Sequence, residues 1–170
     1  MRRFWFFLVL FLVLFISRDW IFGSEATSSA QISPPSQEIP SPIPKILAVA
    51  KSLEGAPYKA AGENPEGFDC SGFVGYVFKQ EGLKLPRNSQ SLMTWKPHLD
   101  SAAIQPGDLL YFTGSDASSS RAGHVALVVS HSQDKLEMIH ATNRGVVIDN
   151  LKTMPYYLKR YLGANRPWQP

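Results

Sequence analysis

Cysteine is nearly absent from this chain: Cys70 is the only one among 170 residues. A single cysteine cannot form an intramolecular disulfide, so we expect no disulfide framework. No cysteine stands directly after the apolar run Phe4–Ile16, so we expect no lipid-attached cysteine there. A lone cysteine is either a small buried apolar residue or a reactive thiol, and its neighbours in the sequence must distinguish the two.

The excess of charge of either sign is also small. The chain has 17 Lys and Arg residues against 14 Asp and Glu, a formal net charge of +3. Residues 1–23 contain Arg2, Arg3, Arg18 and Asp19, so the rest of the chain carries a net charge of +1. Nucleic-acid-binding domains typically show a basic stripe, which this sequence lacks. We therefore expect no nucleic-acid partner.

A long hydrophobic run is missing as well, because the longest one, Phe4–Ile16, has 13 residues. A transmembrane helix needs about 20 apolar residues. The run follows Arg2 and Arg3 and precedes the polar residues 17–19, which is the order of a secretory signal. We expect residues 1–23 to be a signal peptide, or alternatively a membrane anchor that attaches the protein to the membrane. Either way we expect export to the periplasm, the cell envelope or the extracellular space.

The next segment, residues 24–44, is rich in Ser and Pro and has no hydrophobic periodicity. Such a segment buries too little apolar surface to offset the entropy lost on ordering. We therefore expect an extended linker there and one domain over residues 45–170.

Apolar spacing within this domain changes from helical to alternating along the chain. The helical part predicts three helices, at residues 43–53, 70–81 and 89–93. The later part predicts five extended segments, at residues 108–112, 124–129, 136–141, 146–151 and 161–166. Helices followed by an antiparallel meander predict an α+β domain in which the N-terminal helices pack on a β-sheet.

Cys70 falls in the first turn of the second predicted helix, directly after Asp69, which is a favourable N-cap residue. The free backbone N–H groups and the positive end of the helix dipole stabilise a thiolate there. A structural cysteine would instead share the apolar face with Phe73 and Val77. The position therefore favours a reactive thiol over a packing role.

A nucleophilic thiol needs a base, and the chain has four histidines. His98 and His131 fall in polar loop segments. His124 and His140 instead stand in apolar, strand-like runs, where an imidazole needs a polar partner. If the connecting turn has an odd number of residues, both rings face the same side of one hairpin, about 5–8 Å apart. His140 would then fix the tautomer of His124, whereas the alternative is two core histidines bonded to backbone groups.

A zinc site is a further alternative, since zinc binds thiolate and imidazole groups. Its ligands would be Cys70, His124, His131 and His140. Their spacing matches none of the common compact Cys/His patterns, so we expect no metal.

Five short blocks of the sequence occur in the order seen in the NlpC-type family of bacterial cell-wall cysteine peptidases. They are Gly55-Ala-Pro-Tyr58, Phe68-Asp-Cys-Ser-Gly-Phe73, Pro106-Gly-Asp-Leu109, Gly123-His-Val125 and Ile139-His-Ala141. The chain resembles this family over nearly all of residues 45–166, and five ordered blocks are far more specific than any one of them. The resemblance implies a compact, papain-like fold.

The resemblance also implies a role for each matching residue. It makes Cys70 the nucleophile, His124 the general base and then acid, and His140 the polar residue that orients His124. Tyr58 matches the tyrosine whose hydroxyl stabilises the oxyanion together with the backbone N–H of Cys70. Two further positions match residues that shape the substrate cleft: Asp69 and Ser71.

The activity implied by the resemblance is hydrolysis of a peptidoglycan stem-peptide amide, typically the bond between γ-D-glutamate and the following diamino acid. No cofactor is implied, the partner is the stem peptide, and we expect a monomer. Two other functions are alternatives. One is a papain-like acyltransferase or amidase, which the order of Cys70 before both histidines disfavours. The other is a non-catalytic wall-binding module, which the presence of all three residues disfavours.

Two positions depart from the family pattern. A double glycine usually follows the tyrosine block, and here Ala61-Gly62 stands instead. A glutamine often lies three residues after the serine that matches Ser89, and this chain has Leu92 there, with Gln90 nearby. We expect these departures to affect substrate fit more than activity.

Overall fold

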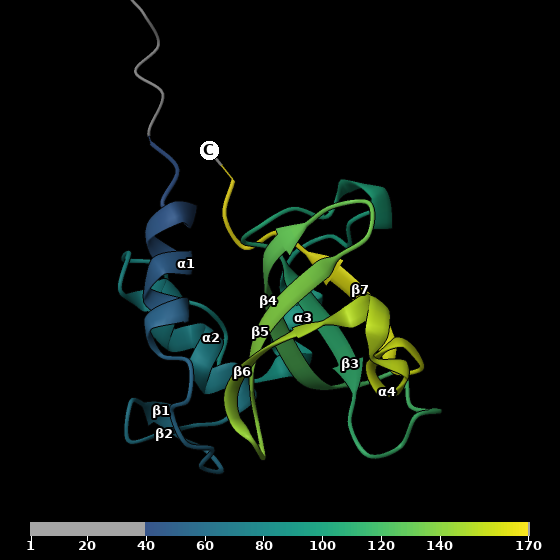
Figure 1. The fold of residues 1–170 in the computed structure, drawn as a ribbon, viewed down its shortest axis with the longest axis horizontal. Coiled ribbons are helices and arrows are strands. Elements are labelled where there is room, and N and C mark those ends of the chain that lie inside the picture. Colours follow the sequence, from purple (N-terminus) through teal and green to yellow (C-terminus); the bar gives the residue numbers. More distant parts are fainter. Residues whose placement is uncertain (1–39, 170) are drawn as a thin grey trace, which may run out of the picture. The chain divides into compact units, whose positions relative to one another are not determined.

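The computed structural model describes residues 40–169, and Figure 1 shows their arrangement. The predicted signal peptide or anchor, residues 1–23, lies outside the described residues, as does the predicted linker as far as residue 39. Within residues 40–169, the helices are all too short or too polar to cross a bilayer.

Three helices precede the main sheet, as the apolar spacing predicted: α1 (Ile43–Ser52), α2 (Cys70–Lys79) and α3 (Ser89–Trp95). The inward face of α1 buries Ile46 and Ala50. The side chains of Asp69 and Asn88 cap α2 and α3, because each accepts a hydrogen bond from a backbone N–H in the first turn. A small hairpin that the sequence did not predict lies between α1 and α2: β1 (Glu63–Asn64) and β2 (Gly67–Phe68).

The main sheet has five antiparallel strands in the order β6-β5-β4-β3-β7. Their bounds are β3 (Leu109–Thr113), β4 (Ala122–His131), β5 (Leu136–Thr142), β6 (Gly145–Asn150) and β7 (Tyr161–Asn165). The predicted α+β class, with N-terminal helices beside an antiparallel sheet, is confirmed.

The path of the last strand differs from the expected meander. β3 to β6 pair in sequence order, but β7 pairs with β3 at the other edge of the sheet. Two short helices, η2 (Leu151–Thr153) and α4 (Pro155–Leu158), carry the chain between the two edges. A third, η1 (Ser101–Ala103), precedes β3. The apolar alternation of a strand does not say which partner it pairs with, so the sequence did not reveal this return.

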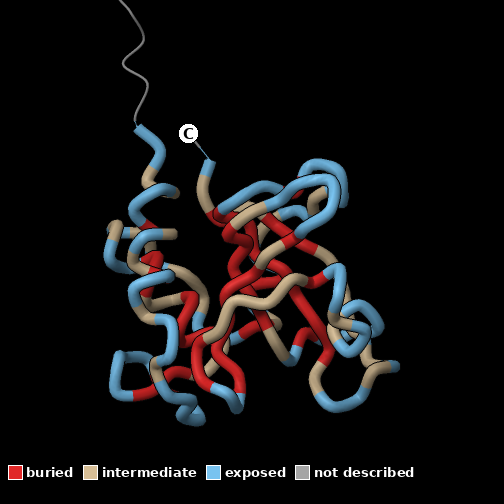
Figure 2. The backbone as a smooth tube through the Cα atoms, viewed as in Figure 1, coloured by how far each residue is buried: buried red, intermediate tan, exposed pale blue. Residues whose placement is uncertain are grey.

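The three inner strands of the sheet, β3, β4 and β5, are mostly buried, as the red segments of Figure 2 show. Alternate residues of β4 belong to different apolar clusters. Val125 and Leu127 pack in the cluster that includes α1, α2 and α3, whereas Ala126 and Val128 pack in the cluster under η2 and α4. A strand covered on both sides reads as a continuous apolar run, which explains the unbroken apolar run Val125–Val129 within β4.

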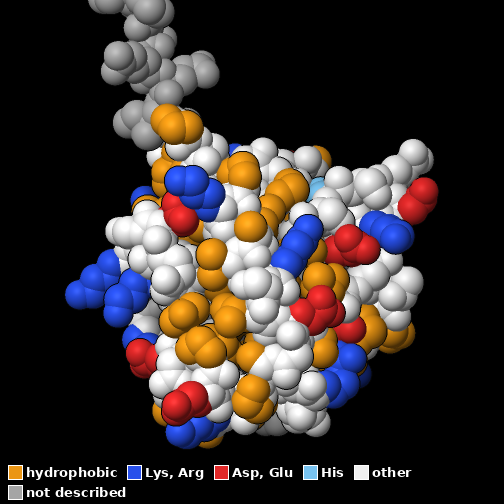
Figure 3. Space-filling view, turned by 60° about the vertical axis from the view of Figure 1, so that its left-hand side comes forward, with side chains coloured by type: hydrophobic (Ala, Val, Ile, Leu, Met, Phe, Trp, Pro, Cys, Tyr) orange, Lys and Arg blue, Asp and Glu red, His pale blue; other side chains and the backbone are white. Residues whose placement is uncertain are grey.

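The surface that carries the helices mixes charges of both signs. Figure 3 shows Lys and Arg side chains interspersed with Asp and Glu, and hydrophobic side chains exposed between them. Lys45 of α1 forms an ion pair with Glu81, which lies just after α2.

A buried hydrogen-bond group connects the sheet to α3. The hydroxyl of Tyr111 on β3 donates to Oδ1 of Asn165 on β7, at 2.8 Å. The amide nitrogen of Asn165 donates to the backbone oxygen of Leu92, also at 2.8 Å. Tyr111 and Asn165 are completely buried. Water does not reach these polar atoms, so breaking their hydrogen bonds would leave them unpaired. The group therefore holds β7 at the edge of the sheet beside β3.

We predict that Tyr111→Phe lowers the free energy of unfolding by about 1–3 kcal/mol, since it leaves the buried Oδ1 of Asn165 without a donor. Urea denaturation followed by circular dichroism measures the change. Tyr76→Phe is the control, because within residues 40–169 the Tyr76 hydroxyl makes no hydrogen bond. Equal stability of the two variants would contradict the prediction.

Candidate active site

Cys70 is the first residue of α2, and the side chain before it caps the helix. Asp69 Oδ1 accepts a hydrogen bond from the N–H of Gly72 at 2.6 Å. The Cys70 sulfur lies beside the backbone N–H of Val125, the residue that follows His124. The start of α2 therefore meets the start of β4, as the predicted roles of Cys70 and His124 require.

Burial raises the pKa of the Cys70 thiol, and the negative charge of Asp69 adds to the rise. The N–H groups of Val125 and Ser71 act in the opposite direction, because they stabilise the thiolate. Since burial dominates, Cys70 is a neutral thiol at neutral pH. It therefore needs a base to become a nucleophile.

Arg87 holds the two residues on either side of Cys70. Its guanidinium donates to both carboxylate oxygens of Asp69, at 3.1 and 2.8 Å, and to the hydroxyl of Ser71 at 2.9 Å. It also forms an ion pair with Glu63 of β1. Burial by itself raises the pKa of Asp69, but the hydrogen bonds from Arg87 and Gly72 outweigh it, so the pKa is lowered. Asp69 is therefore an ionised helix cap fixed by a bidentate arginine.

The rings of His124 and His140 are in direct contact. Nε2 of His124 lies 2.9 Å from Nδ1 of His140, and the ring centroids are 5.2 Å apart. On its other side, Nε2 of His140 lies 3.0 Å from Oδ2 of Asp149. The alternative of two core histidines bonded only to backbone groups is therefore wrong.

A register shift in β4 brings these two rings onto one face of the sheet. At the turn, His131 pairs with Leu136. That register, continued, would set His140 opposite Leu127 and on the other face from His124. Between Val128 and Ser130 the register shifts by one residue. Beyond the shift, Ala126 is opposite His140, so His124 becomes its diagonal neighbour on the same face.

Both histidines are neutral at neutral pH. Burial lowers the pKa of His124, and the adjacent His140 lowers it further. Burial also lowers the pKa of His140, although the hydrogen bond and the charge of Asp149 oppose this effect. The Cys70 thiol is neutral as well, and its sulfur lies beside the residue that follows His124, whose neutral imidazole is able to accept a proton.

Tyr157 of α4 covers the histidine pair. Its ring stacks on His124 with a centroid distance of 5.6 Å and meets His140 edge-on at 5.1 Å. Burial raises the pKa of Tyr157 to about 12, and the negative charge of Asp149 adds to the rise. Tyr157 touches both rings and therefore covers one side of the histidine pair.

Two side chains of α3 fix the start of β4. The hydroxyl of Ser89 donates to the backbone oxygen of Ala122 at 2.9 Å, and Gln90 accepts a hydrogen bond from the N–H of Ala122 at 2.7 Å. Ala122 lies two residues before His124. These bonds hold the backbone of His124 in place.

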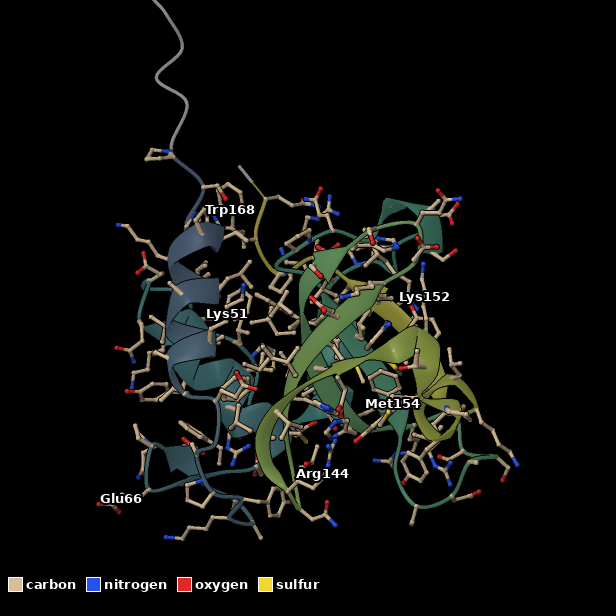
Figure 4. The ribbon with its side chains drawn as sticks, viewed as in Figure 1. Lys51, Glu66, Arg144, Lys152, Met154 and Trp168 are labelled. Atoms are coloured by element: carbon tan, nitrogen blue, oxygen red, sulfur yellow. The ribbon has the colours of Figure 1, made fainter. Side chains whose placement is uncertain are left out.

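An open groove with a volume of about 690 Å³ exposes His124 to solvent. Tyr58, whose exposed fraction is 47%, lines this groove together with Arg144, Met154 and Tyr157. In Figure 4, Arg144 stands at the end of the β5–β6 hairpin and Met154 beside α4. Tyr58 and His124, predicted from sequence to act together, therefore share one groove.

Asp69 and Ser71 do not line this groove. Ser71 instead lines a second hollow along α2 together with Arg87 and Glu63, with a volume of about 710 Å³. The structure thus separates the predicted site residues into two regions beside Cys70.

The zinc alternative is not supported, because within residues 40–169 no three His, Cys, Asp or Glu side chains converge on a common point. His131 lies at the far end of β4, where its Nδ1 is 2.8 Å from the backbone oxygen of Ile104.

A model of the NlpC/P60 family matches residues 55–166. The chain belongs to the NlpC/P60 family. It is 36% identical over 123 residues to a gamma-DL-glutamyl hydrolase of Bacillus subtilis, which covers 71% of this chain and 29% of the relative. It is 34% identical over 132 residues to a gamma-D-glutamyl-L-lysine dipeptidyl-peptidase of Bacillus cereus, which covers 76% of this chain and 38% of the relative. The chain therefore spans well under half the length of these curated relatives.

Solved structures of the NlpC/P60 family share the fold. One family protein from Bacillus cereus superimposes with a TM-score of 0.65 at 32% identity, over 75% of this chain and 40% of that one. The NlpC/p60 domain of the peptidoglycan hydrolase SagA gives a TM-score of 0.57 at 26% identity, over 72% of this chain and 96% of that one. The resemblance inferred from the five sequence blocks is confirmed.

The two departures from the NlpC/P60 pattern have simple structural accounts. Leu92, in the place of a glutamine, is completely buried in the core beside α2, and Gln90 bonds to β4. Ala61 adopts a φ of 57°, a left-handed conformation that glycine adopts more readily. A Cβ on Gly62 would come within 2.2 Å of the backbone oxygen of Gly67, so this glycine is required.

Sequence reasoning missed three side chains of this NlpC/P60 site: Asp149, Tyr157 and Arg87. Asp149 stands within the predicted strand 146–151, where a carboxylate is unusual. That polar residue in a strand was the available signal. Tyr157 and Arg87 lie in connecting segments and are brought to the site by tertiary structure, so no local pattern indicated them.

We predict that Asp69→Asn moves the pH dependence of Cys70 alkylation by iodoacetamide to lower pH. Asparagine still caps α2, but the negative charge that raises the pKa of the thiol is gone. Mass spectrometry measures the rate without ambiguity, because Cys70 is the only cysteine. Asp116→Asn in the loop before β4 is the matched control and should leave the profile unchanged. A shift to higher pH in Asp69→Asn would contradict the prediction.

Proposed function

We propose that this chain is an exported cysteine peptidase that hydrolyses a stem-peptide amide bond of peptidoglycan. The observation that carries the proposal is the contact between the neutral imidazoles of His124 and His140, beside the thiol at the start of α2. Family membership and the names of the relatives supply the class of substrate.

In the first step, the Cys70 sulfur attacks the amide carbon as its proton passes to Nδ1 of His124. Nδ1 is the nitrogen left for this role because Nε2 faces His140. The electron pair of the carbonyl double bond moves to oxygen and forms a tetrahedral oxyanion. Tyr157, packed on His124, covers one side of the developing imidazolium.

The oxyanion needs donors placed before the reaction begins. The backbone N–H of Cys70, at the positive end of α2, is one candidate, since no intrahelical acceptor is available to it. The hydroxyl of Tyr58, in the same groove as His124, is the second. We propose that the two share the oxyanion.

The intermediate then collapses as the carbon–nitrogen bond breaks. His124 donates its new proton to the leaving amine, and the acyl group remains on Cys70 as a thioester. Water next attacks the thioester while His124 takes a proton from it. The carboxylic acid leaves, and Cys70 regains its proton from His124. The cycle consumes one water and needs no metal or organic cofactor.

For the bond cleaved, we propose the amide between γ-D-glutamate and the following diamino acid. The curated relatives from Bacillus subtilis and Bacillus cereus carry names that specify γ-glutamyl bonds. The groove beside His124 is open, so a stem peptide attached to a polymer is able to enter it from the side. Peptidoglycan lies outside the cytoplasmic membrane, which agrees with the export signal inferred for residues 1–23.

We predict that Cys70→Ala and His124→Ala each lower the rate of muropeptide cleavage on the order of 10³-fold or more, because each removes a group that acts on the reacting atoms. Mass spectrometry of purified muropeptides incubated with the full chain detects the released fragment and identifies the bond. His131→Ala, at the far end of β4, is the control and should cleave at the wild-type rate. A correctly folded Cys70→Ala variant that still cleaves would falsify the covalent mechanism.

We predict that Tyr58→Phe lowers kcat by roughly 10²-fold with little change in KM, because an oxyanion donor acts in the transition state and not on bound substrate. Steady-state kinetics on a purified muropeptide separate the two constants. A higher KM at unchanged kcat would instead assign Tyr58 to substrate binding.

A further inference from the structure

Asp149 lies next to His140 on the same face of the sheet. In the pairing of β5 with β6, Met138 is opposite Asp149 and His140 is opposite Val147, so Asp149 is the diagonal neighbour of His140. Its Oδ2 is 3.0 Å from Nε2 of His140, and the guanidinium of Arg144 donates to the same oxygen. The side chain of Asp149 is only 12% exposed. Asp149 is therefore the third polar group in a buried line that starts at His124.

The carboxylate of Asp149 acts only as an acceptor. Burial by itself raises its pKa, but the hydrogen bonds from His140 and Arg144 outweigh burial, and the pKa is lowered. An ionised carboxylate has no proton to donate. The proton in the contact with His140 must therefore be on Nε2 of His140.

This single constraint sets the direction of the hydrogen bond between the two rings. A neutral imidazole carries one N–H, so Nδ1 of His140 has a free lone pair and accepts. Nε2 of His124 must then be the donor across the 2.9 Å contact. Because His124 is also neutral, its Nδ1 carries the remaining lone pair, which is the atom that takes the proton of Cys70.

We propose that Asp149 is a positioning residue that fixes the tautomers of both histidines and so keeps Nδ1 of His124 unprotonated and ready to act as a base. This inference rests on the proposed function. Without the carboxylate, His140 is free to donate from Nδ1 to His124. His124 would then carry its proton on Nδ1 and could not deprotonate Cys70.

The charge of Asp149 has a second effect once His124 has accepted the proton. The imidazolium then donates from Nε2 to His140, whose far side faces the carboxylate. Other charged or titratable groups that face the pair are Tyr157 from α4, Arg144 from the β5–β6 turn and Cys70 from α2. Of these, the tyrosine and the thiol are neutral at rest, so Asp149 is the anion that favours the imidazolium and Arg144 is the cation that opposes it.

Tautomers are measured directly by the ¹⁵N chemical shifts of the imidazole nitrogens in the full chain. We expect Nε2–H on both His124 and His140 in the wild type. Asp149→Ala should place a proton on Nδ1 of one or both rings in a large fraction of molecules. Asp149→Asn should largely keep the wild-type tautomers, since the amide oxygen still accepts from His140. This variant replaces the alanine variant in the experiment if the alanine variant does not fold.

The pH profile of kcat/KM on a muropeptide supplies a second readout. Asp149 raises the pKa of His140 and Arg144 lowers it. The acid limb should therefore move to lower pH in Asp149→Asn and to higher pH in Arg144→Gln. We also expect the maximum of kcat/KM to fall about tenfold in Asp149→Asn and about 100-fold in Asp149→Ala. Glu137→Gln, on β5 opposite Asn150, is the matched carboxylate control and should change neither limb nor maximum.

Wild-type tautomers in a folded Asp149→Ala variant would overturn the inference. So would a fall in activity in Asp149→Asn with no movement of the acid limb, because that is the behaviour expected of a structural residue. The ¹⁵N measurement needs no substrate. Failure of the proposed function would therefore appear as an inactive wild type, and failure of this inference as unchanged tautomers in the alanine variant.

Discussion

The register shift between Val128 and Ser130 is the constraint on which the site depends. Side chains of a strand alternate between two faces, so a shift of one residue moves every later side chain to the other face. Here the shift brings the ring of His124 to the face that carries His140. Bulges of this kind locally increase twist and re-aim side chains, and they are common next to active sites.

A second local feature aligns the other side of the same line. The β5–β6 turn has two residues between Thr142 and Gly145, and this fixes which residue of β6 faces His140. Gly145 has a φ of +89°, and a Cβ there would come within 2.7 Å of the backbone oxygen of Ala56. A glycine at this position therefore allows both the turn and the close approach of the segment after α1. Three strands thus present one residue each to a continuous hydrogen-bonded line.

The energetics of this line explain why it lies under Tyr157. Buried polar groups are costly unless each one is paired, and here each ring nitrogen that faces the interior has a partner. Burial also keeps both imidazoles and the thiol of Cys70 neutral. Charge then develops only when a proton moves from sulfur to His124. The surrounding dipoles and the carboxylate of Asp149 are already oriented for that change, so little reorganisation is required.

Much of this was predictable from local sequence. Asp69 before Cys70 indicated a helix start, and the structure has the cap and the first turn there, because capping depends on adjacent residues only. The apolar alternation around His124 and His140 indicated two neighbouring strands, which β4 and β5 are. The five ordered blocks indicated the NlpC/P60 family, and its model matches. The hairpin β1–β2 escaped notice, because two-residue strands have no measurable period.

The sequence by itself thus determined the three longer helices, the five strands of the main sheet, the order of Cys70 before the two histidines, and the family. Tertiary structure alone decided that the two rings touch, that Asp149 lies behind them, that Arg87 holds Asp69, and that β7 returns beside β3. The physical reason is the range of the interactions. Caps and periodicity arise from residues a few positions apart, whereas a one-residue register shift and the approach of side chains distant along the chain follow from the packing of the whole domain.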